Sequence, residues 1–361
     1  MAEQRTSLDP IARALVLGDR LPDSIDQVGF AAARRHSLAP LLLGMARDQG
    51  AELDPNEATQ LGISDLQSQA RSQRQGQAIA RLSTLAEGVG VEVCVIKGLW
   101  NATSLYPAVG FRPSGDVDLF VGHWPSESRR SIFEQLEVNP ERIDAVEMLA
   151  DRSTQIHEVK VVTPDGLPNM DFHFNPLGFV ERTKIAVRDH LVHRNLPDIG
   201  VVLGPRPELG LLIALSNISR DRRANLLSVA DAVRLISGAA GEFDWPQFWK
   251  IAAEDDLRSF AQQSLWAMLD DLDWQVDCGV ARPSRRAKWC AELGNPKGPL
   301  PAGVVQLSRG SELRPRHVRD VARWYLPTSA LLTARDDVGH ESGWRRSVSV
   351  ARKWIDTRVR T

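Results

Sequence analysis

The chain has 361 residues, of which 43% are hydrophobic, so it is long enough to bury sizeable cores in two or three domains. A formal net charge of −2 and a pI of about 6.5 exclude an overall electrostatic attraction to nucleic acid. No apolar run reaches membrane-spanning length, and the amino terminus lacks the apolar core of a secretory signal. We therefore expect a cytoplasmic protein whose Cys94, Cys278 and Cys290, odd in number and without metal-ligand spacing, are reduced and mostly buried.

Helical patterns dominate the chain from about Ile11 to Leu85. One buried helix face is predicted by the spacing of Leu38, Leu41, Leu42 and Met45. The run Asp54-Pro55-Asn56-Glu57 has the composition of a helix start. We interpret residues 1–87 as an amino-terminal helical region that packs on the following part.

Residues 88–203 read as a mixed α/β unit. Val91 to Ile96 is β-branched and apolar, which predicts a strand, and Leu99 to Tyr106 reads as a helix. Lys97-Gly98 lies at the turn between them, where a glycine allows close backbone approach and a helix start attracts phosphate. The alternative is an ordinary turn with a solvated lysine.

Asp116-Val117-Asp118 begins a predicted buried strand that continues through Leu119-Phe120-Val121. Alternation along a strand sends both carboxylates to one face, with Cα atoms about 6–7 Å apart. Two such carboxylates can converge on one or two hard cations that prefer oxygen ligands. A strand that emerges into solvent would explain the same pair.

A hairpin is predicted downstream, with strands at Ile156 to Val162 and Asn169 to Phe174 around a turn at 163–166. Asp171 and His173 share one face of its second strand. Three strand-borne acids near a phosphate-binding turn favour two-metal phosphoryl or nucleotidyl transfer. His173 could assist proton transfer or be a structural histidine beside the site.

Helical patterns return from residue 204, and Asp244 opens one of the helices. We interpret 204–361 as a carboxy-terminal helical domain. The basic segment 345–360 could bind RNA, although an amphipathic terminal helix explains it as well. The expected fold class is α+β, with a small mixed-sheet core flanked by two helical regions.

Several short motifs occur together: Ile96-Lys97-Gly98, Leu105-Tyr106-Pro107, Arg112-Pro113, the run from Gly115 to Val121, and Met170-Asp171-Phe172-His173-Phe174. Their combination resembles the signature of the uncharacterised nucleotidyltransferase family, within the polymerase β-like nucleotidyltransferase superfamily. Further segments are similar to the family over most of the chain: Ala32 to Leu42, Leu226 to Leu235, and Tyr325 to Thr328.

The resemblance implies roles for particular residues. Asp116 and Asp118 would hold Mg²⁺, or Mn²⁺, together with a nucleoside triphosphate, and Asp171 would complete the site as a ligand or as a base. Lys97, Gly98 and Arg112 would bind the nucleotide, although Arg112 could instead pair with a carboxylate. The sequence departs from the wider superfamily in having Lys-Gly where Gly-Ser is usual. It also has Ser216-Asn217-Ile218 where many relatives carry a histidine-containing helix, so we assign that helix no chemistry.

The resulting hypothesis is a metal-dependent nucleotidyltransferase. It would transfer a nucleoside monophosphate from a nucleoside triphosphate to an unidentified acceptor and release pyrophosphate. The acceptor could be a small molecule, a glycan precursor, a peptide or a protein. Two alternatives stay open: a toxin-like transferase that acts on tRNA, and a catalytically silent nucleotide-binding scaffold.

Overall fold

The computed structural model is a mixed helical and stranded protein, which confirms the α+β class. Of the residues that the structure describes, 58% are helical, and the strands among them form a three-stranded and a two-stranded sheet. The structure describes residues 8–151, 158–162, 167–177, 183, 185–220, 226–239 and 242–283. The predicted turn at 163–166, the 325–328 motif, the basic segment 345–360 and Cys290 lie outside these residues. Within them, no helix combines the length and the apolar character needed to cross a membrane.

The amino-terminal region is helical, as predicted, and consists of α1 (Pro10–Leu17), α2 (Gln27–Arg35), α3 (Ala39–Gln49) and α4 (Pro55–Gly88). The predicted start of α4 is confirmed, because the Asp54 side chain accepts hydrogen bonds from the backbone N–H groups of Asn56 and Glu57. Leu38, Leu41 and Leu42 are buried, also as predicted, whereas Met45 is only partly buried.

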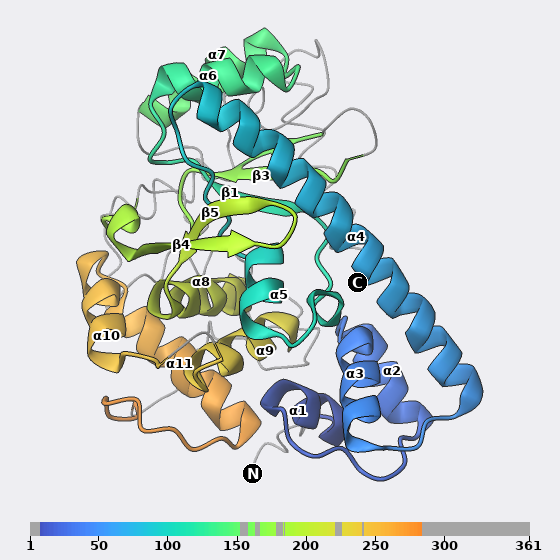
Figure 1. Cartoon of the computed structure of the whole chain (residues 1–361). Helices are drawn as coiled ribbons and strands as arrows, with labels where there is room; N and C mark the ends of the chain where they lie inside the picture. The colour runs from blue at the N-terminus through green and yellow to red at the C-terminus, as the bar shows by residue number, and fades with distance from the viewer. Residues whose placement is uncertain are drawn as a thin grey trace, which may run out of the picture.

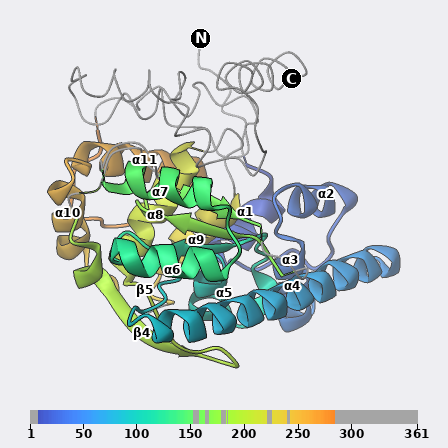
Figure 2. The ribbon, with the colours of Figure 1, turned by 90° about the horizontal axis from the view of Figure 1, so that it is seen from above.

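Helix α4 is 34 residues long and runs along one side of the molecule, from α2 and α3 to α6 (Figures 1 and 2). Its two ends lie in different hydrophobic clusters, with Leu61 in one and Ile79 in the other. Between these ends its buried face is polar and includes Ser68, Ser72 and Gln75. The middle of α4 therefore contributes polar groups rather than apolar packing.

The larger sheet has the order β1-β3-β2, formed by β1 (Val117–Phe120), β3 (Met170–His173) and β2 (Glu158–Val161). β1 and β3 are parallel, with Asp118 opposite Asp171. β2 is antiparallel to β3, which confirms the predicted hairpin, and its Lys160 also lies opposite Asp171. Because partners in register point to the same face, one face of this sheet collects the charged side chains.

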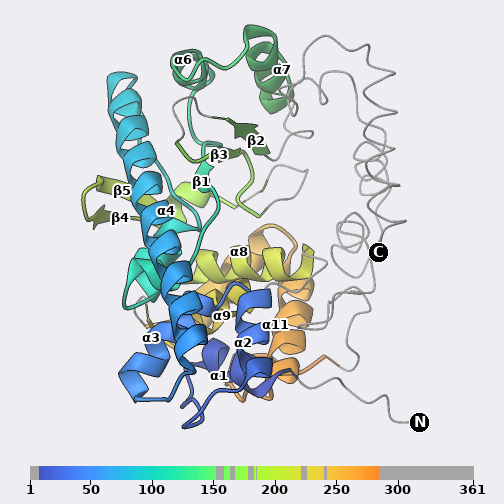
Figure 3. The same ribbon diagram turned by 90° about the vertical axis from the view of Figure 1, so that its right-hand side faces the viewer.

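The opposite face of the sheet is apolar and is covered by α6 (Ser126–Gln135) and α7 (Pro140–Asp151), as Figure 3 shows. Phe133 of α6 packs edge to face on Phe172 of β3, with ring centroids 5.0 Å apart. This packing makes the sheet a rigid support for the charged face.

The smaller sheet pairs β4 (Leu191–Leu196) with β5 (Gly200–Pro205) and follows the short helix η2 (Val187–His190). The strand predicted over Val91 to Ile96 is wrong as a regular element, because only isolated bridges at Cys94 and Val95 form. The segment runs between two sheets: the Val95 N–H donates to Leu203 of β5, while Cys94 accepts from the Phe120 N–H of β1. Neither sheet therefore gives this segment the continuous series of backbone hydrogen bonds that a regular strand has.

After the sheets come α8 (Pro207–Arg220), α9 (Leu226–Ile236), α10 (Trp245–Glu254) and α11 (Arg258–Leu272). The helix predicted to open at Asp244 is confirmed, because its side chain accepts from the Gln247 N–H. These helices and the amino-terminal ones share a single hydrophobic cluster, to which α1 contributes Leu15 and α9 contributes Val229. The division at residues 87 and 203 stays a prediction. Cys94 and Cys278 are free and buried, as expected.

Candidate active site

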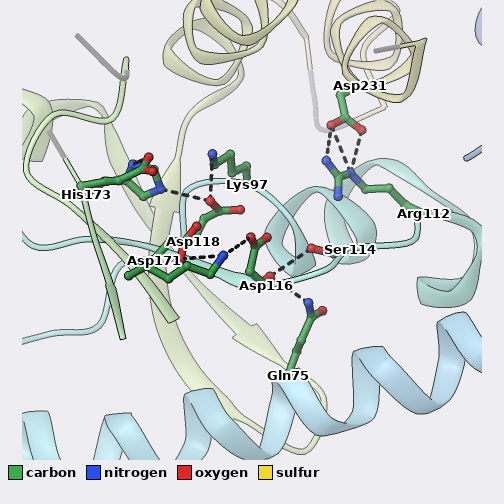
Figure 4. Close-up of polar contacts among 11 residues, drawn as sticks. Gln75, Lys97, Arg112, Ser114, Asp116, Asp118, Asp171, His173 and Asp231 are labelled. Atoms are coloured by element: carbon green, nitrogen blue, oxygen red, sulfur yellow. Dashed lines mark hydrogen bonds and ion pairs between the residues drawn. The ribbon is translucent and has the colours of Figure 1, made fainter. Parts of the chain in front are cut away.

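Three carboxylates meet on the charged face of the larger sheet. Asp116, Asp118 and Asp171 each offer one oxygen, and these oxygens all lie within 4.8 Å of one another (Figure 4). Alternation places the first two on one side, and the parallel register of β1 and β3 brings the third beside them. Strand pairing thus brings together Asp118 and Asp171, which are far apart along the chain.

The backbone at Asp116 is fixed by two side chains. Its carbonyl accepts hydrogen bonds from Gln75 Nε2 at 2.8 Å and from Ser114 Oγ at 3.1 Å. Gln75 belongs to α4 and is fully buried. Sequence reasoning missed Gln75, because the helical pattern of α4 carries no sign of a partner 41 residues downstream.

Asp118 is held by two cationic or hydrogen-bonding partners. Its Oδ1 atom lies 2.8 Å from Lys97 Nζ and 3.0 Å from His173 Nε2. Burial by itself would raise the pKa of Asp118, but Lys97 and His173 outweigh burial and hold that pKa well below its usual range. Since an ionised carboxylate can only accept, His173 donates from Nε2.

His173 therefore acts here as a structural partner of Asp118. Burial, followed by the charge of Lys97, lowers the pKa of His173, which favours the neutral ring. The side chain is 2% exposed. The alternative of a histidine hydrogen-bonded beside the site is the one that the geometry favours.

Asp171 differs from Asp118 in its surroundings. Burial and the neighbouring carboxylate of Asp116 raise the pKa of Asp171 to about 7, although Lys160 opposes this. Its Oδ1 atom is buried and accepts no hydrogen bond from the described residues. Lys160 Nζ lies 3.5 Å from this atom and 3.5 Å from Asp116 Oδ2. Burial would lower the pKa of Lys160, but the two carboxylates raise it.

This donor set fits a divalent cation. Mg²⁺ and Mn²⁺ prefer carboxylate oxygens, and three of these converge on the same volume. The buried Asp171 oxygen without a hydrogen bond is a group that such an ion would satisfy. Asp116, Asp118 and Asp171 are the residues that would hold it.

Gly98 shapes the edge of the site. Its backbone has φ 53° and ψ −114°, a conformation that residues with a side chain rarely adopt. A Cβ atom there would lie 2.8 Å from Ser114 Oγ and 3.5 Å from Asp118 Oδ2. Glycine is therefore needed both for the turn that starts α5 (Leu99–Leu105) and for the close approach to the carboxylates.

Arg112 follows the short helix η1 (Val109–Phe111) and pairs with Asp231 of α9. Arg112 Nη2 lies 2.7 Å from Asp231 Oδ2, and Nε lies 2.9 Å from Oδ1. Tyr106 Oη and Asn101 Nδ2 donate to the same carboxylate at 2.8 and 2.9 Å. Carboxylate pairing, one of the two predicted alternatives, is thus what the structure shows, while Arg112 is also one of the residues that line the cavity.

A cavity of about 440 Å³ opens over Asp116 and Asp118, a volume that suits a small-molecule substrate, and Asp171 is not among the residues that line it. Predicted site residues that line it are Lys97, Gly98, Arg112, Asp116 and Asp118. Its far walls come from other parts of the chain and consist of Ser37, Arg71, Asn217, Leu227 and Ser228.

Sequence reasoning missed these far walls, and it assigned no chemistry to the helix that carries Asn217. The signal that could have found them was the resemblance to the family of two further segments, since Ala32 to Leu42 contains Ser37 and Leu226 to Leu235 contains Leu227 and Ser228. The walls are mostly polar, so they fit a substrate rich in hydrogen-bonding groups.

The carboxylate triad on the small mixed sheet thus lies beside a polar cavity that has Lys97 and Arg71 on its walls. The family model described as uncharacterised nucleotidyltransferase matches residues 27–269, more than half of the chain. The chain belongs to that family, as the sequence motifs indicated. No curated protein and no solved structure matches it.

Proposed function

We propose that this protein is a metal-dependent nucleotidyltransferase that transfers a nucleoside monophosphate from a nucleoside triphosphate to an acceptor. The acceptor oxygen forms a bond to the α-phosphorus, the bond to the bridging oxygen breaks, and pyrophosphate leaves. The observation that carries the proposal is the convergence of three carboxylate oxygens within 4.8 Å. A bound Mg²⁺ or Mn²⁺ would supply positive charge to the triphosphate and to the leaving group.

The protein's own residues have distinct tasks in this proposal. Asp116 and Asp118 hold the cation, and Asp171 completes the set, placed either to bind the cation or to take the proton of an acceptor hydroxyl. Lys97 and the Gly98 backbone contact the phosphates. Because Lys97 is already 2.8 Å from Asp118, it connects the phosphate contact to the metal ligands. His173 keeps Asp118 oriented.

Arg112 contributes through its place on the cavity wall. Two of its nitrogens face Asp231, so its guanidinium is fixed before a substrate arrives. We propose that it meets the nucleotide from this fixed position.

The acceptor in this proposal is a small molecule, a glycan precursor, a peptide or a protein. Support comes from the far walls of the cavity, which offer Ser37, Asn217 and Ser228 as hydrogen-bonding groups and Arg71 as a cation. A net charge of −2 gives no overall attraction to a polynucleotide.

Calorimetric titration of the four nucleoside triphosphates with Mg²⁺ tests the site. The wild type and the control Asp144→Asn, an exposed carboxylate paired with Arg130, should bind one triphosphate saturably. Asp116→Asn and Asp118→Asn should fold but lose this binding and lose transfer of label from an α-³²P triphosphate. Full turnover by either variant overturns the assignment. Label recovered in RNA would instead favour the tRNA-directed alternative.

A further inference from the structure

Lys160 is a cation that lies between two of the three carboxylates. Its Nζ atom is 3.5 Å from Asp116 Oδ2 and 3.5 Å from Asp171 Oδ1. It belongs neither to the motifs that resemble the family nor to the residues predicted for the site. Its position is nevertheless the one that a cation shared by these two carboxylates would take.

The strand register places Lys160 there. In the antiparallel pair β2–β3, Lys160 is the direct cross-strand partner of Asp171. Its neighbours Val159 and Val161 are buried on the other face of the sheet. The backbone of Lys160 is therefore fixed in a rigid strand. Its ammonium group can move away from the carboxylates only by rotation of the flexible side chain.

Lys97 is bound more tightly to its carboxylate partner than Lys160 is to its two partners. Lys97 Nζ is 2.8 Å from Asp118, and its side chain is 19% exposed. Lys160 makes only 3.5 Å contacts, and its side chain is 46% exposed. An exposed pair with long contacts costs little to separate. Lys160 is thus the cation that can leave the site.

An ammonium group and a divalent cation cannot occupy the same position. A cation that binds both Asp116 Oδ2 and Asp171 Oδ1 needs each oxygen at roughly 2.0–2.6 Å, which leaves no room for Nζ between them. Binding of the ion therefore requires that Lys160 give up both of its contacts. The ammonium group and the ion compete for the same two oxygens.

We propose that Lys160 is a tethered counter-ion that competes with the divalent cation for Asp116 and Asp171. It keeps the affinity of the site for a free metal ion low, so that the ion is bound mainly when a nucleotide adds its own phosphate ligands. The inference rests on the proposed function, because it needs these carboxylates to bind a metal.

Mn²⁺ binding without nucleotide tests the competition, followed by electron paramagnetic resonance at constant ionic strength. Lys160→Met should bind Mn²⁺ about three- to fivefold more tightly than the wild type, the upper part of the range expected for loss of a partly exposed ion pair. Lys160→Arg keeps the charge and should stay within about twofold. Lys250→Met is the matched control, because it removes one exposed lysine charge on α10, outside the cavity.

Melting temperatures give a second readout that does not depend on turnover. In EDTA, Lys160→Met should melt below the wild type, because Asp116 and Asp171 then repel each other without compensation. Added Mn²⁺ should raise its melting temperature by more than it raises that of the wild type.

Each outcome decides between the two proposals. Equal or weaker Mn²⁺ binding by Lys160→Met, with binding retained in the wild type, overturns the role of Lys160 and leaves the proposed function standing. Absence of Mn²⁺ binding in both proteins overturns the metal site and the competition together. If Lys250→Met also binds Mn²⁺ more tightly than the wild type, the effect arises from the net charge of the protein. That result overturns a specific role for the contacts of Lys160.

Discussion

The carboxylate of Asp231 offers a strong test of the packing around the site, and we predict that Asp231→Leu is severely destabilising. Asp231 and Arg112 have side chains that are 3% and 8% exposed. Loss of the carboxylate leaves the guanidinium buried without its charge partner, and also leaves Tyr106 Oη and Asn101 Nδ2 without their acceptor.

The loss in free energy of unfolding depends on whether the group that loses its partner is charged or neutral. Removal of one partner from a buried ion pair costs about 3–5 kcal/mol, whereas a single hydrogen bond to a charged group is worth about 1.5–3 kcal/mol. Tyr106→Phe removes one hydrogen bond to the same carboxylate and leaves the ion pair in place, so it should cost less than Asp231→Leu, about 1.5–3 kcal/mol. Urea unfolding followed by circular dichroism measures both variants against the wild type.

A double-mutant cycle isolates the charge. If the cost arises from the unpaired guanidinium, the double variant Arg112→Met/Asp231→Leu should be more stable than Asp231→Leu alone, because two apolar groups replace the pair. Additive costs, or a cost for Asp231→Leu no larger than that of Tyr106→Phe, would refute the reasoning.

Three further predictions concern single residues. Gly98→Ala should destabilise the protein by about 1–3 kcal/mol and reduce nucleotide binding, measured by urea unfolding and calorimetry, because alanine is strained at φ 53°. In a Cys290→Ser variant, Cys94 and Cys278 should not react with a maleimide until the protein unfolds, because burial raises the pKa of both thiols. In EDTA, stability should fall as the pH rises from about 4 to about 7, because folded Asp171 keeps a proton that the unfolded chain releases. The midpoint of urea unfolding, compared with Asp171→Asn, measures this slope.

The contrary results are specific. Rapid labelling of a folded Cys290→Ser protein would contradict the burial of the two thiols. If the urea midpoints of the wild type and of Asp171→Asn change in parallel with pH, Asp171 does not titrate between about pH 4 and about pH 7. Wild-type stability and nucleotide binding in Gly98→Ala would mean that the turn relaxes to accept a side chain.

Local patterns in the sequence predicted the parts of the site that local physics determines. The alternation around Asp116 and Asp118 placed both carboxylates on one face, and the hairpin pattern placed Asp171 on a paired strand. Strand periodicity reads such positions directly, because every second residue shares a face. The capped start of α4 at Asp54 was predictable for the same reason, since a cap and its donors lie within one turn.

Contacts between distant segments could not be predicted in this way. Arg112 and Asp231 are 119 residues apart, and neither local pattern specifies the other as its partner. The strand expected at Val91 to Ile96 has the right composition, but its neighbours belong to two different sheets. Lys160 was within a predicted strand, and only the register across the hairpin shows that it faces Asp171.

The position of Gln75 decides how small an active fragment of this protein can be. The strands and carboxylates all lie after residue 88, yet the hydrogen bond that fixes the Asp116 backbone comes from α4. The same helix brings Arg71 to the cavity wall, and Ser37 reaches that wall from the chain before α3. If the proposed function holds, the sheet and its acids alone are an incomplete catalytic unit, because the helices that precede them in the chain line the same cavity.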